Sequence, residues 1–208
     1  GSLAVTGTTR INAGGITTAT TQSYTGAVTL GNTTTLTGST IGFNGTTSTV
    51  NGAVNGMFGL TTTGATTFGG QVGNTAALTT LTVNGTTAIN TDVITTSNVQ
   101  NYTGAVTLGA ATTLTGSAIQ FNTTASTVNG AFALTTNGTT TFGGLVGGTT
   151  PLTSLTVNGT SAINGGGVTT TGIQSYSDAI TLGATTTLSV GTALTATSIG
   201  GASGLTIT

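Results

Sequence analysis

QNYTGAVTLG, at residues 100–109, recurs twice more in the chain, and this repetition determines the architecture. The motif occurs earlier as QSYTGAVTLG at 22–31 and later as QSYSDAITLG at 174–183. Aligning Tyr24, Tyr102 and Tyr176 brings the three copies into register, with the first offset slightly longer than the second. Self-similarity of this kind is the signature of a repeat architecture, in which each repeat stacks on its neighbours.

The rest of the chain falls into the same register. Three further blocks recur: SLAVTGTTRIN (2–12), TLTVNGTTAIN (80–90) and SLTVNGTSAIN (154–164); TLTGSTIGFN (35–44) and TLTGSAIQFN (113–122); TTFGGQVG (66–73) and TTFGGLVG (140–147). We therefore predict one continuous domain over 1–208, with repeats at 2–79, 80–153 and 154–208, the last partial and divergent. Extra residues at 53–56 account for the difference between the two offsets.

The composition is nearly free of charge. Arg10, Asp92 and Asp178 are the charged side chains, against 61 threonines and 36 glycines, and the chain lacks Trp, Cys and His. A net charge of −1 offers no electrostatic footprint for nucleic acid or anionic lipid. No stretch approaches the roughly 20 apolar residues of a membrane-spanning helix, so membrane insertion is not expected. The start at Gly1-Ser2, without Met, suggests a fragment excised from a longer protein.

The local pattern predicts short β-strands. Leu3 and Val5, like Leu81 and Val83 in the next repeat, alternate with Thr or Ala, which is the period of a half-buried strand. The strands are followed by Gly, Gly-Gly or Asn-Gly, as at Asn84-Gly85, which supply the positive φ angles of tight turns. No segment has helical spacing, and Thr and Gly are poor helix formers.

These strands fit a parallel β-solenoid better than tandem antiparallel β-sandwiches, which stay open as the alternative. A sandwich needs a thick core, normally with Trp or several aromatic residues. A solenoid encloses a thin core, and stacked threonines suit flat parallel sheets. Each repeat would divide into four coils of roughly 19 residues, which predicts about 11 coils in all. Asn at recurring turns suggests amide ladders between coils. Disorder is disfavoured, because β-branched and aromatic residues recur at fixed spacing.

All nine aromatic residues lie at four positions of the repeat. We predict the phenylalanines as core residues: Phe43, Phe121, Phe58, Phe132, Phe68 and Phe142. The tyrosines Tyr24, Tyr102 and Tyr176 form either a packing row or a surface row, since a phenol can lie half buried at the surface.

The residues that would carry chemistry are almost absent. Without His or Cys, and with two acids, the chain has no familiar zinc or iron site. Asp92 and Asp178 lie at different positions of different repeats, so nothing pairs them as acid and base. Ala88 and Ala162 replace Arg10 at its position in the other repeats. We therefore expect no enzyme activity, no catalytic or metal-binding residues and no cofactor.

Three stretches resemble a known kind of repeat: SLTVNGTSAINGGGVTTTG (154–172), QNYTGAVTLGAATTLTG (100–116) and TTTFGGLVG (139–147). They look like the long repeats of filamentous-haemagglutinin-like and autotransporter-like β-strand-repeat adhesins of bacteria. The likeness extends to about Thr187, after which the tail drops the GSAIQFN segment. It implies a right-handed parallel β-helix, location outside the bacterial cell or on its surface, and a place in a long fibre that serves adhesion, aggregation or biofilm.

The sequence thus favours a rigid, protease-resistant structural segment of such a fibre or adhesin. Its expected partners are other copies of itself, end to end or laterally, and host or cell-surface glycans. One alternative is an ice-binding solenoid, for which Thr35-Leu36-Thr37 and Thr113-Leu114-Thr115 show the Thr-X-Thr unit. The other is a carbohydrate-binding or phage-fibre segment that uses the tyrosine row.

Overall fold

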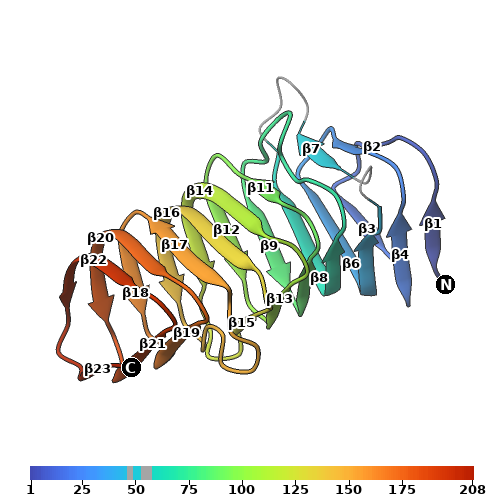
Figure 1. Ribbon diagram of the computed structural model, residues 1–208. Helices are drawn as coiled ribbons and strands as arrows, with labels where there is room; N and C mark the ends of the chain where they lie inside the picture. Colours follow the sequence, from blue (N-terminus) through green and yellow to red (C-terminus); the bar gives the residue numbers. More distant parts are fainter. Residues whose placement is uncertain (46–48, 53–57) are drawn as a thin grey trace.

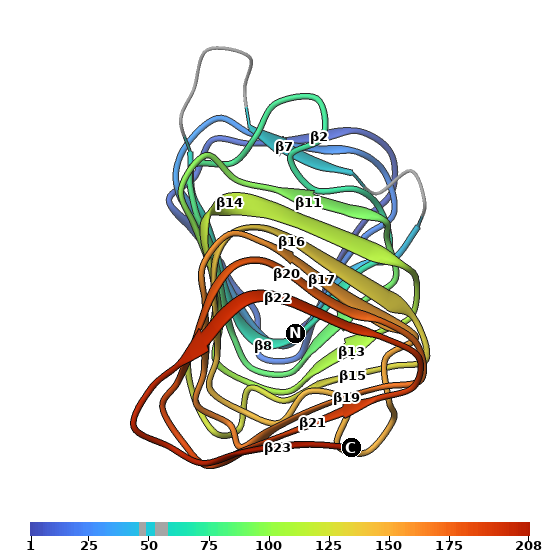
Figure 2. The same cartoon turned by 60° about the vertical axis from the view of Figure 1, so that its left-hand side comes forward.

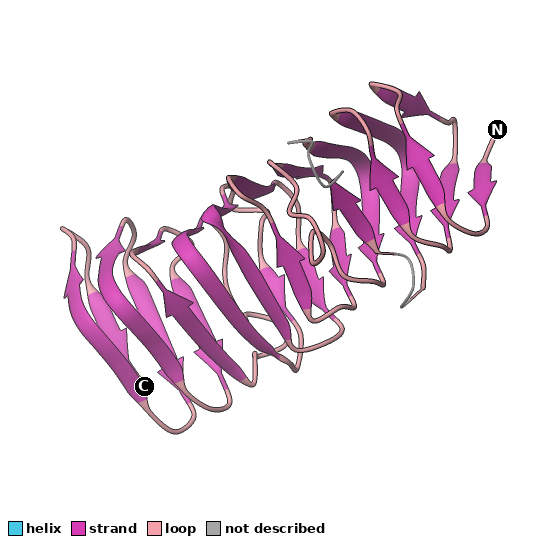
Figure 3. Cartoon of the chain, turned by 90° about the horizontal axis from the view of Figure 1, so that it is seen from above, coloured by secondary structure: helices cyan, strands magenta, loops and turns pink. Residues whose placement is uncertain are grey.

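The computed structural model describes residues 1–45, 49–52 and 58–208, which form an elongated all-β solenoid of about 10 turns (Figure 1). The described residues contain strands and no helix (Figure 3). The strands are β1 (Leu3–Val5), β2 (Thr9–Ile11), β3 (Gly15–Thr17), β4 (Thr21–Tyr24), β5 (Val28–Leu30), β6 (Thr34–Phe43), β7 (Val50–Gly52), β8 (Leu60–Phe68), β9 (Leu81–Asn84), β10 (Thr87–Ile89), β11 (Val93–Thr95), β12 (Val99–Tyr102), β13 (Val106–Leu108), β14 (Thr112–Phe121), β15 (Val128–Asn129), β16 (Ala133–Phe142), β17 (Ser154–Asn158), β18 (Ser161–Ile163), β19 (Gly167–Thr170), β20 (Gln174–Leu182), β21 (Thr186–Val190), β22 (Leu194–Gly200) and β23 (Leu205–Ile207).

Every strand pairing among the described residues is parallel, and the strands between the first and last turns pair with residues of the turns before and after them. This confirms the predicted β-solenoid and excludes the antiparallel sandwiches. The expected 11 coils were an overestimate, because several turns are longer than the sequence suggested. For example, the turn from Ile41 to its partner Thr66 contains more residues than the preceding turn, from Gln22 to Ile41. The extra residues assigned to 53–56 lie outside the described part.

Each turn has three faces (Figure 2). Face 1 starts with β1, face 2 with β2 and face 3 with β3, and the chain visits them in that order. The register can be followed along face 1 from Leu3 through paired residues of successive turns: Gln22, Ile41, Thr66, Thr87, Val106, Val128, Val146, Val168, Leu188 and Ile207. One uninterrupted column therefore runs the length of the rod.

The sequence repeat does not contain a whole number of turns. Four turns after Leu3 the column on face 1 reaches Thr87, which lies beyond Leu81, the residue that holds the place of Leu3 in the second repeat. Leu81 instead continues face 3, above Leu60, and Leu155 of the third repeat continues face 2, above Leu134. Each repeat thus spans three turns and two thirds rather than the predicted four. Successive repeats are rotated by a third of a turn.

The core is a thin column of apolar side chains with stacked aromatic rings at intervals. Tyr24, Phe43 and Phe68 stack on face 1, with centroids 5.4 and 5.6 Å apart. Tyr102, Phe121 and Phe142 repeat the stack on face 3, at 5.3 and 5.6 Å. All of these rings are fully buried, as predicted for the four phenylalanines. Offset or stacked aromatic pairs add to the stabilisation that burial supplies.

The remaining two predicted core residues differ from this pattern. Phe58 is partly buried and packs against the core. Phe132 is 38% exposed, so its assignment to the core was wrong. The amide of Phe132 donates to the carbonyl of Gly130, and this tight turn at the corner holds the ring outside the column.

Glycines that stack at the corners of successive turns, which we call the glycine column, let the long strands bend from one face to the next. Strand β16 crosses its corner at Gly138, whose φ is +138°, and β8 crosses at Gly64 with φ +130°. A Cβ at Gly138 would overlap the carbonyl oxygen of Gly116 in the turn below. The glycines of the Asn-Gly pairs at Gly85, Gly130 and Gly159 also have positive φ, as the turn pattern predicts.

Candidate functional surface

The tyrosines do not form a surface row. Tyr24, Tyr102 and Tyr176 are at most 1% exposed, and they lie on faces 1, 3 and 2 because of the rotation between repeats. Burial raises the pKa of the Tyr24 phenol to about 12 and raises the pKa values of the other two further still. The phenols therefore stay protonated near neutral pH, and no ligand reaches the rings without unfolding. A sugar-binding tyrosine row is excluded.

Each tyrosine belongs instead to a buried polar unit with the glutamine two residues before it. The Tyr102 hydroxyl donates to Gln100 Oε1 at 2.9 Å. Gln100 Nε2 donates to the carbonyls of Ile94 at 3.0 Å and of Thr115, in the next turn, at 2.8 Å. Gln22 with Tyr24 and Gln174 with Tyr176 make the same bonds. The unit satisfies buried polar groups and ties adjacent turns together, so its role is structural.

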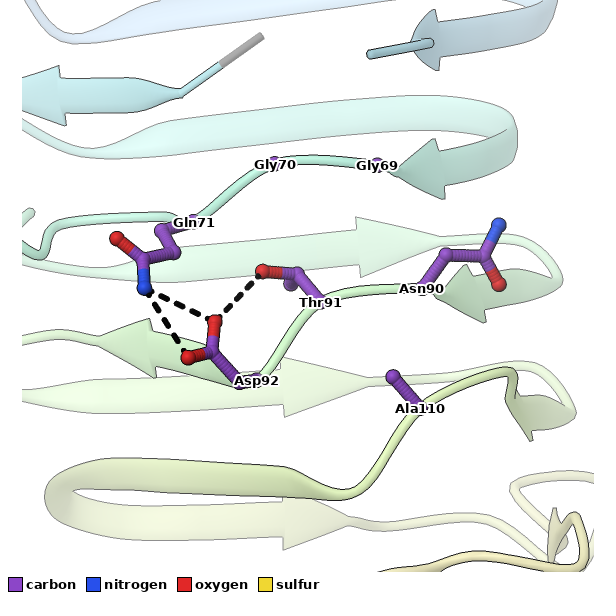
Figure 4. Close-up of a pocket in the computed structure, with 7 residues that line it drawn as sticks. All are labelled: Gly69, Gly70, Gln71, Asn90, Thr91, Asp92 and Ala110. Carbon is purple, nitrogen blue, oxygen red and sulfur yellow. Dashed lines mark hydrogen bonds between the residues drawn. The ribbon is translucent and has the colours of Figure 1, made fainter. Parts of the chain in front are cut away.

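The charged side chains are scattered, and none forms a catalytic pair. Asp92 lies in an open groove of about 380 Å³ (Figure 4). Gln71 Nε2 donates to both of its carboxylate oxygens, at 2.9 and 3.2 Å, and Thr91 Oγ1 donates to Oδ1 at 3.3 Å. Asn74 Nδ2 in turn donates to Gln71 Oε1. The groove therefore presents one carboxylate already held by neutral donors.

The other two charges are solvent-exposed. Arg10 Nε donates to Asn12 Oδ1 at 2.9 Å on the surface of β2. Asp178 is exposed in β20, at the repeat position that Gly26 and Gly104 hold in the first two repeats. Within the described ranges, no group of three or more His, Cys, Asp and Glu residues could hold a metal ion. The described part also has no helix of the length and apolarity needed to cross a membrane.

Face 2 of the carboxy-terminal half carries a flat polar array, which we call the hydroxyl face. It comprises the outward residues of β14, β16, β17, β20 and β22, whose long strands stack in Figure 2. One column is Thr113, Thr135, Thr156, Ser175 and Thr195, and the next is Thr115, Asn137, Asn158, Ser177 and Thr197. Asp178, directly after Ser177, marks the margin of this otherwise uncharged surface.

The two columns of the hydroxyl face differ in their hydrogen bonding. In the second column, Asn158 Nδ2 donates to Asn137 Oδ1 at 2.9 Å and Asn137 Nδ2 donates to Thr115 Oγ1 at 3.1 Å. Thr197 Oγ1 donates to the Ser177 carbonyl at 2.7 Å. This column is an amide and hydroxyl ladder of the kind that the turn asparagines predicted. The hydroxyls of the first column make no side-chain hydrogen bond to the described residues, so they face water.

Alignment of the repeats misses the hydroxyl face, because its residues occupy different repeat positions. Thr113 and Thr135 belong to different segments of the second repeat, and Thr156, Ser175 and Thr195 belong to three segments of the third. The rotation between repeats and the length of each turn bring them together. The signal in the sequence was a polar residue on either side of each inward residue, as in Thr113-Leu114-Thr115 and Ser175-Tyr176-Ser177.

Comparison of the chain with protein-family models, with curated proteins and with solved structures yields no match. The geometry described above therefore has to carry the functional interpretation: a continuous column of paired inward residues, buried polar units that join the turns, and a flat uncharged surface.

Proposed function

We propose that the chain is a rigid, non-enzymatic structural segment of a bacterial extracellular fibre or adhesin. The observation that supports this role is the uninterrupted column from Leu3 to Ile207, in which every turn is bonded to the next. A solenoid of this kind transmits force along its axis through parallel hydrogen-bond ladders, and between Leu60 and Ile207 each turn pairs with the next through such ladders.

The surface supports a role outside the cell. Arg10 is the chain's lone site for a protease that requires Lys or Arg. Low charge removes the repulsion that keeps most proteins apart, so we propose other copies of the chain as its first partners. Host or cell-surface glycans are the second proposed class. They would have to bind hydroxyl and amide groups rather than the buried tyrosines.

Electron microscopy combined with chymotrypsin digestion tests this role. We expect straight rods, on the order of 50 Å long for one copy at one strand spacing per turn. We also expect cleavage after aromatic residues to be confined to Phe58 and Phe132, because the other seven aromatic residues are fully buried. Compact globular particles, or digestion at the buried tyrosines under native conditions, would show that the stalk role is wrong.

The hydroxyl face favours ice binding as a second candidate. Its two columns repeat at roughly 4.8 Å along the rod and roughly 6.7 Å across alternate residues. The first column is a row of hydroxyls, most of them with methyls, and such a flat row can order water in an ice-like manner; the second column adds the amides of Asn137 and Asn158. The array spans five consecutive strands, and the hydroxyls of its first column lack partners among the described residues.

Inhibition of ice recrystallisation tests this candidate. Thr156→Tyr places a bulky ring in the middle of the array and is expected to abolish most of the inhibition. Thr107→Tyr is the matched control, because Thr107 is an exposed outward residue of β13 on face 1. Equal inhibition by the two variants, or none by the unaltered chain, would exclude ice binding by this face.

A further inference from the structure

The groove around Asp92, which we call the Asp92 groove, lies in the middle of the rod, where the chain passes from face 1 to face 2 (Figure 4). It is lined by residues 69–71 after β8, residues 90–92 after β10 and Ala110 after β13, and these three strands pair in succession. Its volume of about 380 Å³ falls within the usual range for small-ligand sites, roughly 300–1,000 Å³. The corner of three successive turns thus forms a recess of the size of a small ligand.

The other repeats form the same corner without the polar side chains of this groove. Four polar residues of the groove and its rim are replaced in the later copy: Gln71 by Leu145, Asn74 by Gly148, Thr91 by Gly165 and Asp92 by Gly166. In the first repeat, Ala13 and Gly14 hold the positions of Thr91 and Asp92. The solenoid therefore folds at this corner without these polar groups, so the fold does not account for their presence in the middle of the chain.

The groove retains unused hydrogen-bonding capacity of both kinds. An ionised carboxylate has about four acceptor positions. Asp92 Oδ1 accepts from Gln71 and Thr91, whereas Oδ2 accepts from Gln71 alone, so Oδ2 keeps an open acceptor position on an exposed side chain. Asn90 lies at the opposite end of the groove from Gln71, and its amide makes no side-chain hydrogen bond to the residues that the structure describes (Figure 4). A ligand thus meets a charged acceptor at one end and an amide donor at the other.

These groups suit a neutral polar ligand better than an ion. Calcium takes roughly six to eight oxygen ligands, whereas Asp92 supplies the single carboxylate of the groove. Gln71 also turns its amide nitrogen, which is a donor, toward that carboxylate, where a metal ion would need an oxygen. An acidic ligand would be repelled by Asp92, and no Lys or Arg lines the groove to offset this repulsion. A group that both donates and accepts hydrogen bonds, such as a hydroxyl, fits both ends.

We propose that the Asp92 groove binds a neutral sugar through its hydroxyl groups. One hydroxyl donates to Asp92 Oδ2, a charge-assisted bond, and another accepts from Asn90 Nδ2. Gly69 and Gly70 carry no side chains, so the sugar ring can lie against the backbone between these two ends. The inference rests on the proposed glycan partners, and it supplies their binding site and the class of sugar.

Titration followed by nuclear magnetic resonance tests the site. The isotope-labelled chain is titrated separately with methyl α-mannoside, methyl β-galactoside and methyl β-glucoside, which are neutral sugars that differ in the arrangement of their hydroxyls. We expect at least one of them to shift the side-chain amide signals of Gln71 and Asn90. The signal of Asn164, which holds the position of Asn90 in the third repeat, is expected to stay in place and serves as the internal control.

The double variant Gln71→Leu with Asp92→Gly gives the groove the residues of the third repeat, so it is expected to fold. We expect it to raise the dissociation constant for the sugar at least tenfold. Asp92→Asn, which keeps the shape of the side chain and removes its charge, is the second variant and is expected to weaken binding in the same direction. Asp178→Asn is the matched control, because it removes the other acid of the chain outside the groove and is expected to leave binding unchanged.

Three results would overturn the assignment. No shift with any of the three sugars would show that the groove is not a sugar site. Equal binding by the unaltered chain and by the double variant would place the sugar elsewhere on the rod. Shifts of the same amide signals with calcium chloride, but not with the sugars, would identify a cation site instead. The stalk role would stand in all three cases, because straight rods and resistance to chymotrypsin do not depend on the groove.

Discussion

Replacing Gln100 with alanine is expected to lower the free energy of unfolding by roughly 3–5 kcal/mol, since it removes three buried hydrogen bonds and leaves a cavity. The Gln100 amide reaches the carbonyl of Ile94 in its own turn and that of Thr115 in the next. It also accepts the bond from Tyr102, whose hydroxyl would lose its partner in a fully buried site. The midpoint of urea unfolding, followed by far-ultraviolet circular dichroism, measures the loss.

Two further variants separate the contributions to this effect. Tyr102→Phe removes the hydroxyl alone and is expected to cost about 1–3 kcal/mol, because Gln100 Oε1 is then buried without a donor. Gln120→Ala is the control, since this glutamine points outward on face 3 and accepts a single bond from Asn122. Its effect is expected to stay within about 0.5 kcal/mol. Equal unfolding midpoints for Gln100→Ala and Gln120→Ala would refute the stabilising role of the buried unit.

Gly138→Ala is expected to be a strongly damaging single-methyl change. The backbone there has a φ of +138°, a conformation that residues with a Cβ rarely adopt. The added methyl would also overlap the Gly116 carbonyl, so β16 would have to move away from β14 at the corner. Strain and lost pairing together are expected to cost at least about 3 kcal/mol and to reduce the yield of folded protein.

Gly14→Ala is the control for this change. Gly14 is exposed, and a Cβ there would meet no atom within 4 Å. Its effect on the unfolding midpoint is expected to be small, with a slight gain from the reduced freedom of the unfolded chain. Thermal denaturation and soluble yield of the two variants, measured side by side, provide the comparison. Similar melting of both variants would mean that the corner tolerates a side chain and that the glycine column is not required.

The strands and turns were predictable, because alternation of inward apolar and outward polar residues is a local property. Leu81-Thr82-Val83 and Asn84-Gly85 show both signals within one short stretch, and the structure contains β9 and a glycine with positive φ there. The rotation between repeats was not predictable, since it depends on where strands bend. Strand β14 passes through its corner at Gly116 as one continuous strand, so no loop marks the boundary between its faces.

The buried polar unit is visible in the spacing of its residues, although the composition of the chain gives no indication of it. Gln100 and Tyr102 lie two residues apart, and strand alternation places both side chains on the same side of β12. The pair recurs in all three repeats, but glutamine usually lies at the surface, so its burial was not predicted from the sequence. The glutamine is buried rather than exposed because the tyrosine hydroxyl and two backbone carbonyls satisfy the hydrogen bonds of its amide. This set of partners exists only after the turns have stacked.

The fractional number of turns in each repeat has a consequence for how such a chain can change length by recombination. Duplicating or deleting one whole repeat turns everything beyond it by a third of a revolution about the rod. A binding patch carried further along would then point in a new direction relative to the surface that anchors the rod. Adding or deleting three repeats at a time preserves the direction in which the patch points, because three repeats span a whole number of turns. Recombination can thus change the chain by one repeat, whereas the orientation recurs only every three repeats.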